Sequence, residues 1–107
     1  MRLLNKNLYT HKKLNEDSWE VTMADETHPV FKAHFEGNPL LPAFLQIDIM
    51  GEILEKTLLS IDRSKFKQPI LPNDVIVYKV LKIVDKSYKI EIFKNEISTT
   101  EFKVSYQ

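Results

Sequence analysis

The sequence predicts an α+β domain in which one long apolar helix is followed by an antiparallel meander of strands that curls around it. Two observations lead to this prediction. Residues 42 to about 60 are apolar over most of a helical circumference, which is typical of a buried helix. After them, segments rich in β-branched and aromatic residues alternate with short polar breaks. A helix that is apolar on nearly all sides needs a cover, and the strands that follow supply it.

Before the helix, the chain reads as two short extended pieces, Leu3–Leu4 and residues 19–22. The polar stretch at residues 11–17 separates them. Pro42 suits the first turn of the helix, where its missing N–H is not needed. Asp48 and Glu52 lie one helical turn apart and begin a narrow polar stripe on the otherwise apolar helix.

After the helix, strands are predicted at four segments of the chain. Their alternation of apolar and polar residues is clearest in the last two, which favours one buried face and one solvent face. Lys86–Ser87 and Asn95–Glu96 have the length of hairpin turns. The predicted strands cover residues 66–71, 74–84, 88–94 and 97–106.

Length and composition indicate one domain spanning residues 1–107. A domain of this size buries only about 60–65% of its unfolded surface. Because 43% of the residues are nevertheless hydrophobic, we expect part of the apolar surface to lie in a subunit interface.

Charge and cysteine content exclude several classes of protein. Fifteen basic and fifteen acidic residues cancel, which argues against a nucleic-acid-binding protein. The absence of cysteine removes disulfides, thiol catalysis and thiolate metal sites. No apolar run approaches the length of a membrane span, and no signal peptide is recognised at the start. We therefore expect a soluble, cytoplasmic protein that binds neither nucleic acid nor membrane.

The candidate catalytic residues lie in one segment, residues 28–50, HPVFKAHFEGNPLLPAFLQIDIM. His34 lies on a loop rich in glycine and proline, and Asp48 lies early on the apolar helix that follows. Imidazole exchanges protons near neutral pH, and a carboxyl group can act as its acid partner. A base on a loop and an acid on a helix point to proton transfer.

The same segment resembles the active-site signature of the 3-hydroxyacyl-[acyl-carrier-protein] dehydratases of the hotdog fold, G-H-F-P-G-x-P-x-x-P-G-V-L-x-x-E/D-A-M. The matching residues fall in register without a gap, from His34-Phe35 through Gly37-Asn38-Pro39, Leu41-Pro42 and Leu45-Gln46 to Asp48. A second segment, FKQPILPND at residues 66–74, is similar to the F-x-x-P-V-x-P-G-D segment of the family. The resemblance implies the hotdog fold and a lyase of lipid metabolism.

The resemblance also implies roles for individual residues. His34 is the base that removes a proton from C2 of a (3R)-3-hydroxyacyl thioester. Asp48 is the acid that protonates the leaving hydroxyl at C3 or holds the water that does so. The backbone N–H of Ala43, where the family has glycine, faces the thioester carbonyl as an oxyanion donor.

Seven further residues are expected to bind the substrate in such an enzyme. They line the acyl chain or shape the loop and helix around the thioester. These residues are Phe31, Phe35, Gly37, Pro42, Phe44, Leu45 and Glu52.

The partners and alternatives follow from the same likeness. The substrate is carried on an acyl carrier protein, and each active site combines His34 of one subunit with Asp48 of another in a homodimer or higher oligomer. No cofactor is needed, and no metal site is expected. Glu36, Ala43 and Glu52 depart from the family pattern. These departures leave open a non-catalytic acyl-chain or acyl-carrier binding module. A hotdog acyl thioesterase, which hydrolyses the same type of substrate, also stays open as an alternative.

The cluster of Arg63, Lys65 and Lys67 has two interpretations. It could contact an acidic carrier protein or the phosphate of a phosphopantetheine arm, or it could be a solvated loop.

Overall fold

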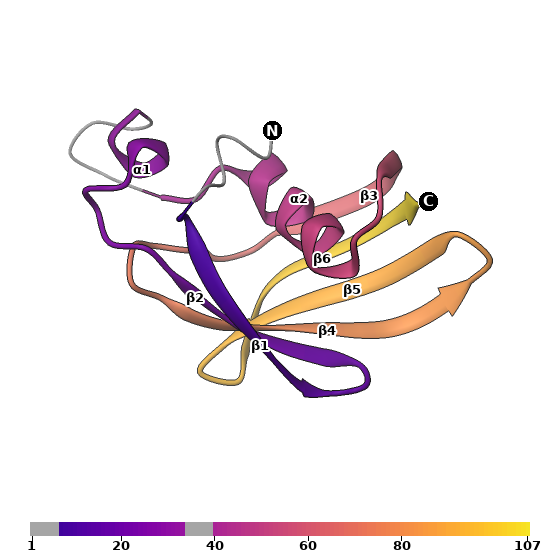
Figure 1. Cartoon of the computed structure of the whole chain (residues 1–107). Coiled ribbons are helices and arrows are strands. Elements are labelled where there is room, and N and C mark those ends of the chain that lie inside the picture. Colours follow the sequence, from indigo (N-terminus) through magenta and orange to yellow (C-terminus); the bar gives the residue numbers. More distant parts are fainter. Residues whose placement is uncertain (1–6, 34–39) are drawn as a thin grey trace.

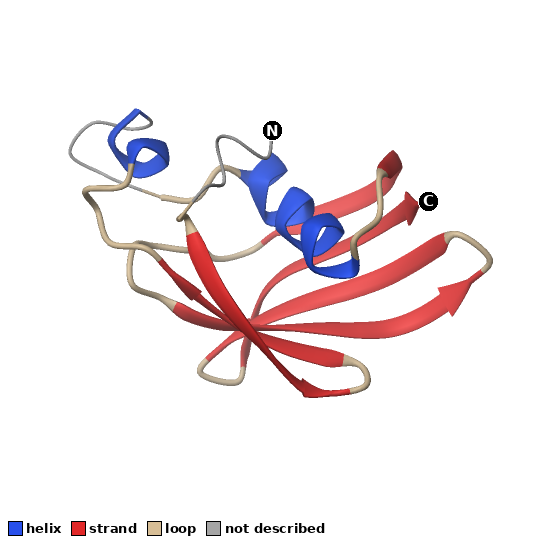
Figure 2. Ribbon diagram, viewed as in Figure 1, coloured by secondary structure: helices blue, strands red, loops and turns tan. Residues whose placement is uncertain are grey.

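The structure is a computed structural model that describes residues 7–33 and 40–107. Its strands form one antiparallel sheet in the order β1-β2-β4-β5-β6-β3, and the long helix α2 lies over one face of this curved sheet (Figures 1 and 2). The predicted α+β class is therefore confirmed. The elements are β1 (Tyr9–Asn15), β2 (Ser18–Met23), α1 (Pro29–Ala33), α2 (Ala43–Leu54), β3 (Leu58–Phe66), β4 (Val75–Val84), β5 (Ser87–Lys94) and β6 (Ile97–Tyr106).

The helix α2 begins where the sequence predicts and ends earlier. Glu55 adopts a left-handed conformation with φ 57°, and its N–H donates to the carbonyl of Glu52. The N–H of Lys56 donates to the carbonyl of Gly51, which completes a Schellman motif. The prediction that the helix continues to about residue 60 is therefore wrong. The stop has no sign in the sequence because it uses glutamate at a position where glycine is usual.

Strand β3 begins directly after this stop, at Leu58, and ends at Phe66. The predicted strand at residues 66–71 is therefore wrong. Residues 67–71 form an irregular connection instead. Pro69 has no N–H to donate to a ladder, which disfavours a strand there. β3 was missed because it lies at the edge of the sheet and is exposed over nearly its whole length, so its sequence lacks a clear alternation.

The polar stretch at residues 11–17, to which the sequence assigned no strand, forms most of β1 and the turn that follows it. Charged side chains on an edge strand discourage pairing with other chains, which explains the polar composition. Lys13 of β1 is paired with Trp19 of β2, and its ammonium lies 5.8 Å from the centre of the indole ring. The extended piece expected at residues 19–22 is confirmed as part of β2, whereas Leu3–Leu4 lie outside the described residues.

The last three strands confirm the predictions to within one residue at each end. The hairpin turns contain residues with positive φ, at Asp85, Asn95 and Glu96, as tight turns between twisted strands require. The inward-facing side chains of these strands pack under α2 and form the centre of the core. Its largest fully buried side chains include Tyr78, Ile90, Ile92, Tyr106, Ile47 and Met50.

Candidate functional site

The two segments that resemble the dehydratase signature lie side by side. The N–H of Leu41, just before α2, donates to the carbonyl of Ile70 over 2.7 Å. Both side chains are buried in the core. The connection between β3 and β4 therefore supports the chain at the entrance to the helix.

A tight turn holds this connection in place. Asn73 has φ 66°, a left-handed conformation that asparagine tolerates and that the glycine of the family motif also suits. The carboxylate of Asp74 accepts the N–H of Leu71 at 2.7 Å and the ammonium of Lys94 at 2.9 Å. Asp74 thus closes the turn and ties it to β5.

Two tyrosine hydroxyls from the sheet hold α2 by its backbone. Tyr78 of β4 donates to the carbonyl of Gln46 at 2.7 Å, and Tyr106 of β6 donates to the carbonyl of Ile47 at 2.9 Å. We call these two residues the tyrosine clamp. They bind consecutive carbonyls immediately before Asp48, so they set the depth and rotation of the helix at that residue.

The clamp residues act as neutral donors. Burial raises the pKa of Tyr78 well above its ordinary value, and the neighbouring Tyr106 adds to this rise. Burial also raises the pKa of Tyr106, and the carboxylate of Asp48 raises it further.

Gly51 makes room for one of these rings. A methyl group at Gly51 would lie 3.2 Å from Cε1 of Tyr106 and 3.3 Å from the carbonyl oxygen of Lys56. A mid-helix glycine costs about 1 kcal/mol relative to alanine. The close approach of the Tyr106 ring explains why glycine stands here.

Asp48 lies between Phe44 and Glu52 on one face of α2. Its side chain is partly buried, as is that of Glu52 one turn later, whereas Phe44 one turn earlier is 45% exposed. The carboxylate of Glu52 accepts the hydroxyl of Tyr9 at 2.7 Å. Glu52 therefore links the helix to β1, a contact that the sequence did not predict.

Gln46 is a buried polar residue that sequence reasoning missed. It is 3% exposed, and its Oε1 accepts the hydroxyl of Thr100 at 2.7 Å. Thr99, next to Thr100, donates to the carbonyl of Ile92 within β5. The only sign of this pair in the sequence was a glutamine between two apolar residues of a helix predicted to be buried.

The start of α2 presents the predicted oxyanion donor. The carbonyl of Pro42 accepts the N–H groups of Leu45 and Gln46, and this forms the first turn. The N–H of Ala43 precedes that turn, and Ala43 is exposed. The group is therefore oriented with the other N–H groups at the positive end of the helix. Its role stays a prediction.

The predicted apolar substrate contacts occupy different surroundings. Phe31 of α1 and Leu45 of α2 are buried in the core of the chain, and Pro42 is partly buried. Phe44 alone among the predicted aromatic contacts of the described region is open to solvent. A role for these residues along an acyl chain stays a prediction.

His34, Phe35 and Gly37 lie outside the described residues, so their geometry relative to Asp48 is not part of the structure. The chain leading to them forms the short helix α1, which the sequence did not predict. Nδ1 of the buried His28 accepts the N–H of Val30 at 3.1 Å and caps this helix. His28 therefore has a structural role here.

Neither a metal-binding cluster nor a membrane-spanning helix is found in the described part of the chain. Residues 7–33 and 40–107 contain no group of three or more histidine, aspartate or glutamate residues that could hold a metal ion. In the same ranges, no helix is both long enough and apolar enough to cross a bilayer.

Comparison with known proteins identifies the family. Residues 11–105 match the family described as ApeI-like, ApeI dehydratase. The chain belongs to the ApeI-like dehydratase family. This ApeI-like chain is also 32% identical over 79 residues to the 3-hydroxyacyl-[acyl-carrier-protein] dehydratase FabZ of Sulfurovum sp., a match that covers 56% of the chain and 53% of that enzyme. It thus spans about half the length of the curated FabZ relatives it matches.

Solved structures confirm the hotdog fold of this ApeI-like chain. The dehydratase heterocomplex ApeI:P from Xenorhabdus doucetiae contains a similar chain, with a TM-score of 0.72, 19% identity, and 91% and 93% of the two chains covered. A hypothetical thioesterase with coenzyme A from Streptococcus pneumoniae is also similar, with a TM-score of 0.59, 11% identity, and 92% and 86% covered. At these identities the likeness concerns the fold.

Proposed function

We propose that this protein dehydrates (3R)-3-hydroxyacyl thioesters, carried on an acyl carrier protein, to trans-2-enoyl thioesters. Membership of the ApeI-like dehydratase family supports the reaction class. The observation that carries the assignment is Asp48, a partly buried carboxyl on α2 that falls in register with the acid of the dehydratase signature. The tyrosine clamp holds the backbone at this residue.

In this mechanism His34 removes a proton from C2, and the electrons move toward the thioester carbonyl. The N–H of Ala43 stabilises the negative charge on that oxygen, an interaction worth about 3 kcal/mol of the barrier. Asp48 then supplies a proton to the hydroxyl at C3, which leaves as water. The reaction moves protons and breaks one C–O bond, so no cofactor enters it.

We propose a homodimer that combines His34 of one subunit with Asp48 of the other. The exposed edge strand β3 supports an interface at this edge. Three large apolar side chains on β3 are strongly exposed, Leu59 at 50%, Ile61 at 44% and Phe66 at 43%. An exposed edge with apolar side chains is a surface that proteins normally cover.

The direct test follows two products of one reaction. A 3-hydroxyacyl carrier thioester is offered to the protein, and enoyl formation and free thiol release are measured together. The chain itself has no cysteine to contribute thiol. Enoyl formation without thiol release is expected.

Two variants with a matched control assign the residues. We expect His34→Ala and Asp48→Asn each to lower turnover by at least about 100-fold, the usual contribution of a positioned acid or base. His11→Ala is the control, because His11 is exposed on β1. Turnover retained in His34→Ala would refute the assignment of the base.

Mixing the two inactive variants tests the shared site. If each site draws one residue from each subunit, random exchange restores one intact site in half of the dimers, or about a quarter of full activity. No recovery after verified subunit exchange would place both residues in the same chain.

A thioesterase is the second candidate, because a chain with this fold occurs in a hypothetical thioesterase that was solved with coenzyme A. The product assay separates the two reactions, since hydrolysis releases thiol without forming an enoyl group. Thiol release would overturn the dehydratase proposal. Binding without either product would favour an acyl-binding module.

A further inference from the structure

The outer face of the sheet, opposite α2, carries a row of four cations on four adjacent strands. Lys82 of β4 is paired with Lys89 of β5, Lys89 is paired with Lys103 of β6, and Lys103 is paired with Arg63 of β3. We call these four residues the cationic row. Like charges directly opposite each other in a sheet are destabilising, so we expect each of the three pairs to lower the free energy of unfolding.

Two β-bulges bring the end members into the row. The register of β4 against β5 shifts between Val80 and Lys82, and the register of β3 against β6 shifts between Ile61 and Arg63. Without these shifts, Leu81 would stand opposite Lys89, and Asp62 would stand opposite Lys103. The bulges therefore replace a neutral and an acidic neighbour with two cations, and bulges often re-aim side chains beside functional sites.

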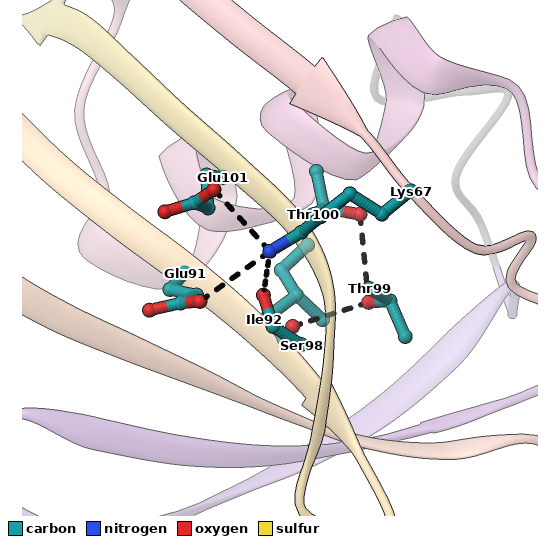
Figure 3. A network of polar contacts seen from close by, with 7 residues as sticks. All are labelled: Lys67, Glu91, Ile92, Ser98, Thr99, Thr100 and Glu101. Atoms are coloured by element: carbon teal, nitrogen blue, oxygen red, sulfur yellow. Dashed lines mark hydrogen bonds and ion pairs between the residues drawn. The ribbon is translucent and has the colours of Figure 1, made fainter.

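Two acidic residues of the same face, Glu91 and Glu101, are already paired with another cation. The ammonium of Lys67 lies 3.2 Å from Glu101 and 3.7 Å from Glu91, and it also contacts Ser98 (Figure 3). Within residues 7–33 and 40–107, the four members of the cationic row form no ion pair with a carboxylate. None of the four described cations is therefore neutralised by a direct ion pair, although the whole chain is neutral.

The row borders a hollow with a volume of about 590 Å³. This size is typical of a site for a small molecule. Five cationic side chains and one acidic side chain, Glu101, line it, together with the hydroxyl of Ser87. The cationic lining residues are Arg63, Lys65, Lys82, Lys89 and Lys103.

We propose that this hollow binds a small anion with two or more phosphate groups. Arginine and lysine bind phosphate through charge-assisted hydrogen bonds, and a serine hydroxyl can add a neutral donor. The row crosses three strand spacings, about 14 Å, so a single phosphate would reach only part of it. A second copy of the chain would bring the same positive face, which argues against sheet-to-sheet pairing of two copies here.

This proposal goes beyond the dehydratase function. Its test measures binding and does not depend on dehydratase activity. Inorganic tripolyphosphate is titrated into the full isotope-labelled chain at about physiological ionic strength, and affinity and amide shifts are measured. Shifts are expected around the cationic row. Lys89→Gln and Lys103→Gln are each expected to weaken binding about tenfold through the loss of one charge-assisted contact.

Two control variants make the result specific. Lys79 lies on the same strand and face as Lys82 and is exposed, but it stands opposite Glu91 and outside the hollow. Lys79→Gln should therefore change the affinity less than about twofold, whereas Lys103→Arg should retain binding because it keeps the charge. Lys89→Gln and Lys103→Gln relieve repulsion, so an unchanged or raised melting temperature will show that the variants are folded.

Further ligands separate the sources of phosphate. ADP tests a nucleotide, a single-stranded oligonucleotide tests nucleic acid, and a pentaglutamate peptide tests a general attraction to negative charge. Binding of tripolyphosphate or ADP that depends on the cationic row supports the proposal. Equal binding of pentaglutamate, binding of the oligonucleotide alone, or equal weakening by Lys79→Gln would overturn it.

Discussion

The two faces of β4, β5, β6 and β3 use the same backbone ladder for opposite purposes. On the inner face, Ile90, Phe102 and Val104 pack under α2, and Tyr78 and Tyr106 hold its backbone. On the outer face, neighbouring positions carry the cationic row. Folding accounts for the side chains of the inner face, whereas the outer row opposes folding and needs another explanation.

The comparison of the two faces predicts the largest difference in the free energy of unfolding at two adjacent residues of β5. Ile90 is fully buried, so Ile90→Ala should lower the free energy of unfolding by about 3 kcal/mol. Lys89→Ala should leave it unchanged or slightly higher, since it relieves repulsion with Lys82 and Lys103. Urea unfolding measures both, and similar losses would contradict the division between the faces.

The tyrosine clamp predicts a smaller loss that depends on pH. Tyr106→Phe removes the bond to the carbonyl of Ile47 and should lower the free energy of unfolding by about 1 kcal/mol at neutral pH. Because the folded-state pKa of Tyr106 is raised above 10.0, the unfolded chain loses this proton first as the pH rises. Stability should therefore be full below pH 10.0 and decline above it.

Urea unfolding between about pH 9 and about pH 11 measures this decline, which should be less steep in Tyr106→Phe. Tyr88→Phe is the matched control, because the Tyr88 ring packs edge-on against Tyr106 with centres 5.4 Å apart. An equally steep decline in wild type and Tyr106→Phe would show that another group governs it.

The smallest expected effect has opposite signs at two lysines of the outer face. Lys103→Glu places an acid between Lys89 and Arg63 and should raise the free energy of unfolding by about 0.5 kcal/mol. Lys79→Glu places an acid opposite Glu91 and should lower it by a similar amount. Both differences should shrink in high salt, and equal signs at the two positions would contradict the repulsion.

The inner face could be predicted from the sequence because burial imposes a period of two on β5 and β6. The helical pattern after Pro42 placed the start of α2, and the family resemblance is confirmed by the match over residues 11–105. The role of Asp48 as the acid stays a prediction. These features depend on local patterns that the chain repeats or on a gapless motif.

The missed features depend on contacts between distant residues. The helix stop at Glu55 has no glycine, and β1 and β3 are edge strands without a buried face to impose alternation. The bulges that complete the cationic row shift the pairing by one residue without a local mark in the sequence. Gln46 meets Thr100 across 54 positions of chain. The catalytic role of His34 stays a prediction, because this residue lies outside the described residues.

The single tryptophan gives the two halves of the sheet separate optical signals. Trp19 lies on β2 between β1 and β4, so its fluorescence reports on that side of the sheet. Tyr78, Tyr88 and Tyr106 lie under α2, and their near-ultraviolet circular dichroism reports on the packing around the helix. Unfolding curves from the two signals should coincide if the molecule melts as one cooperative unit. Separate midpoints would reveal that the N-terminal hairpin detaches while the helix is still held.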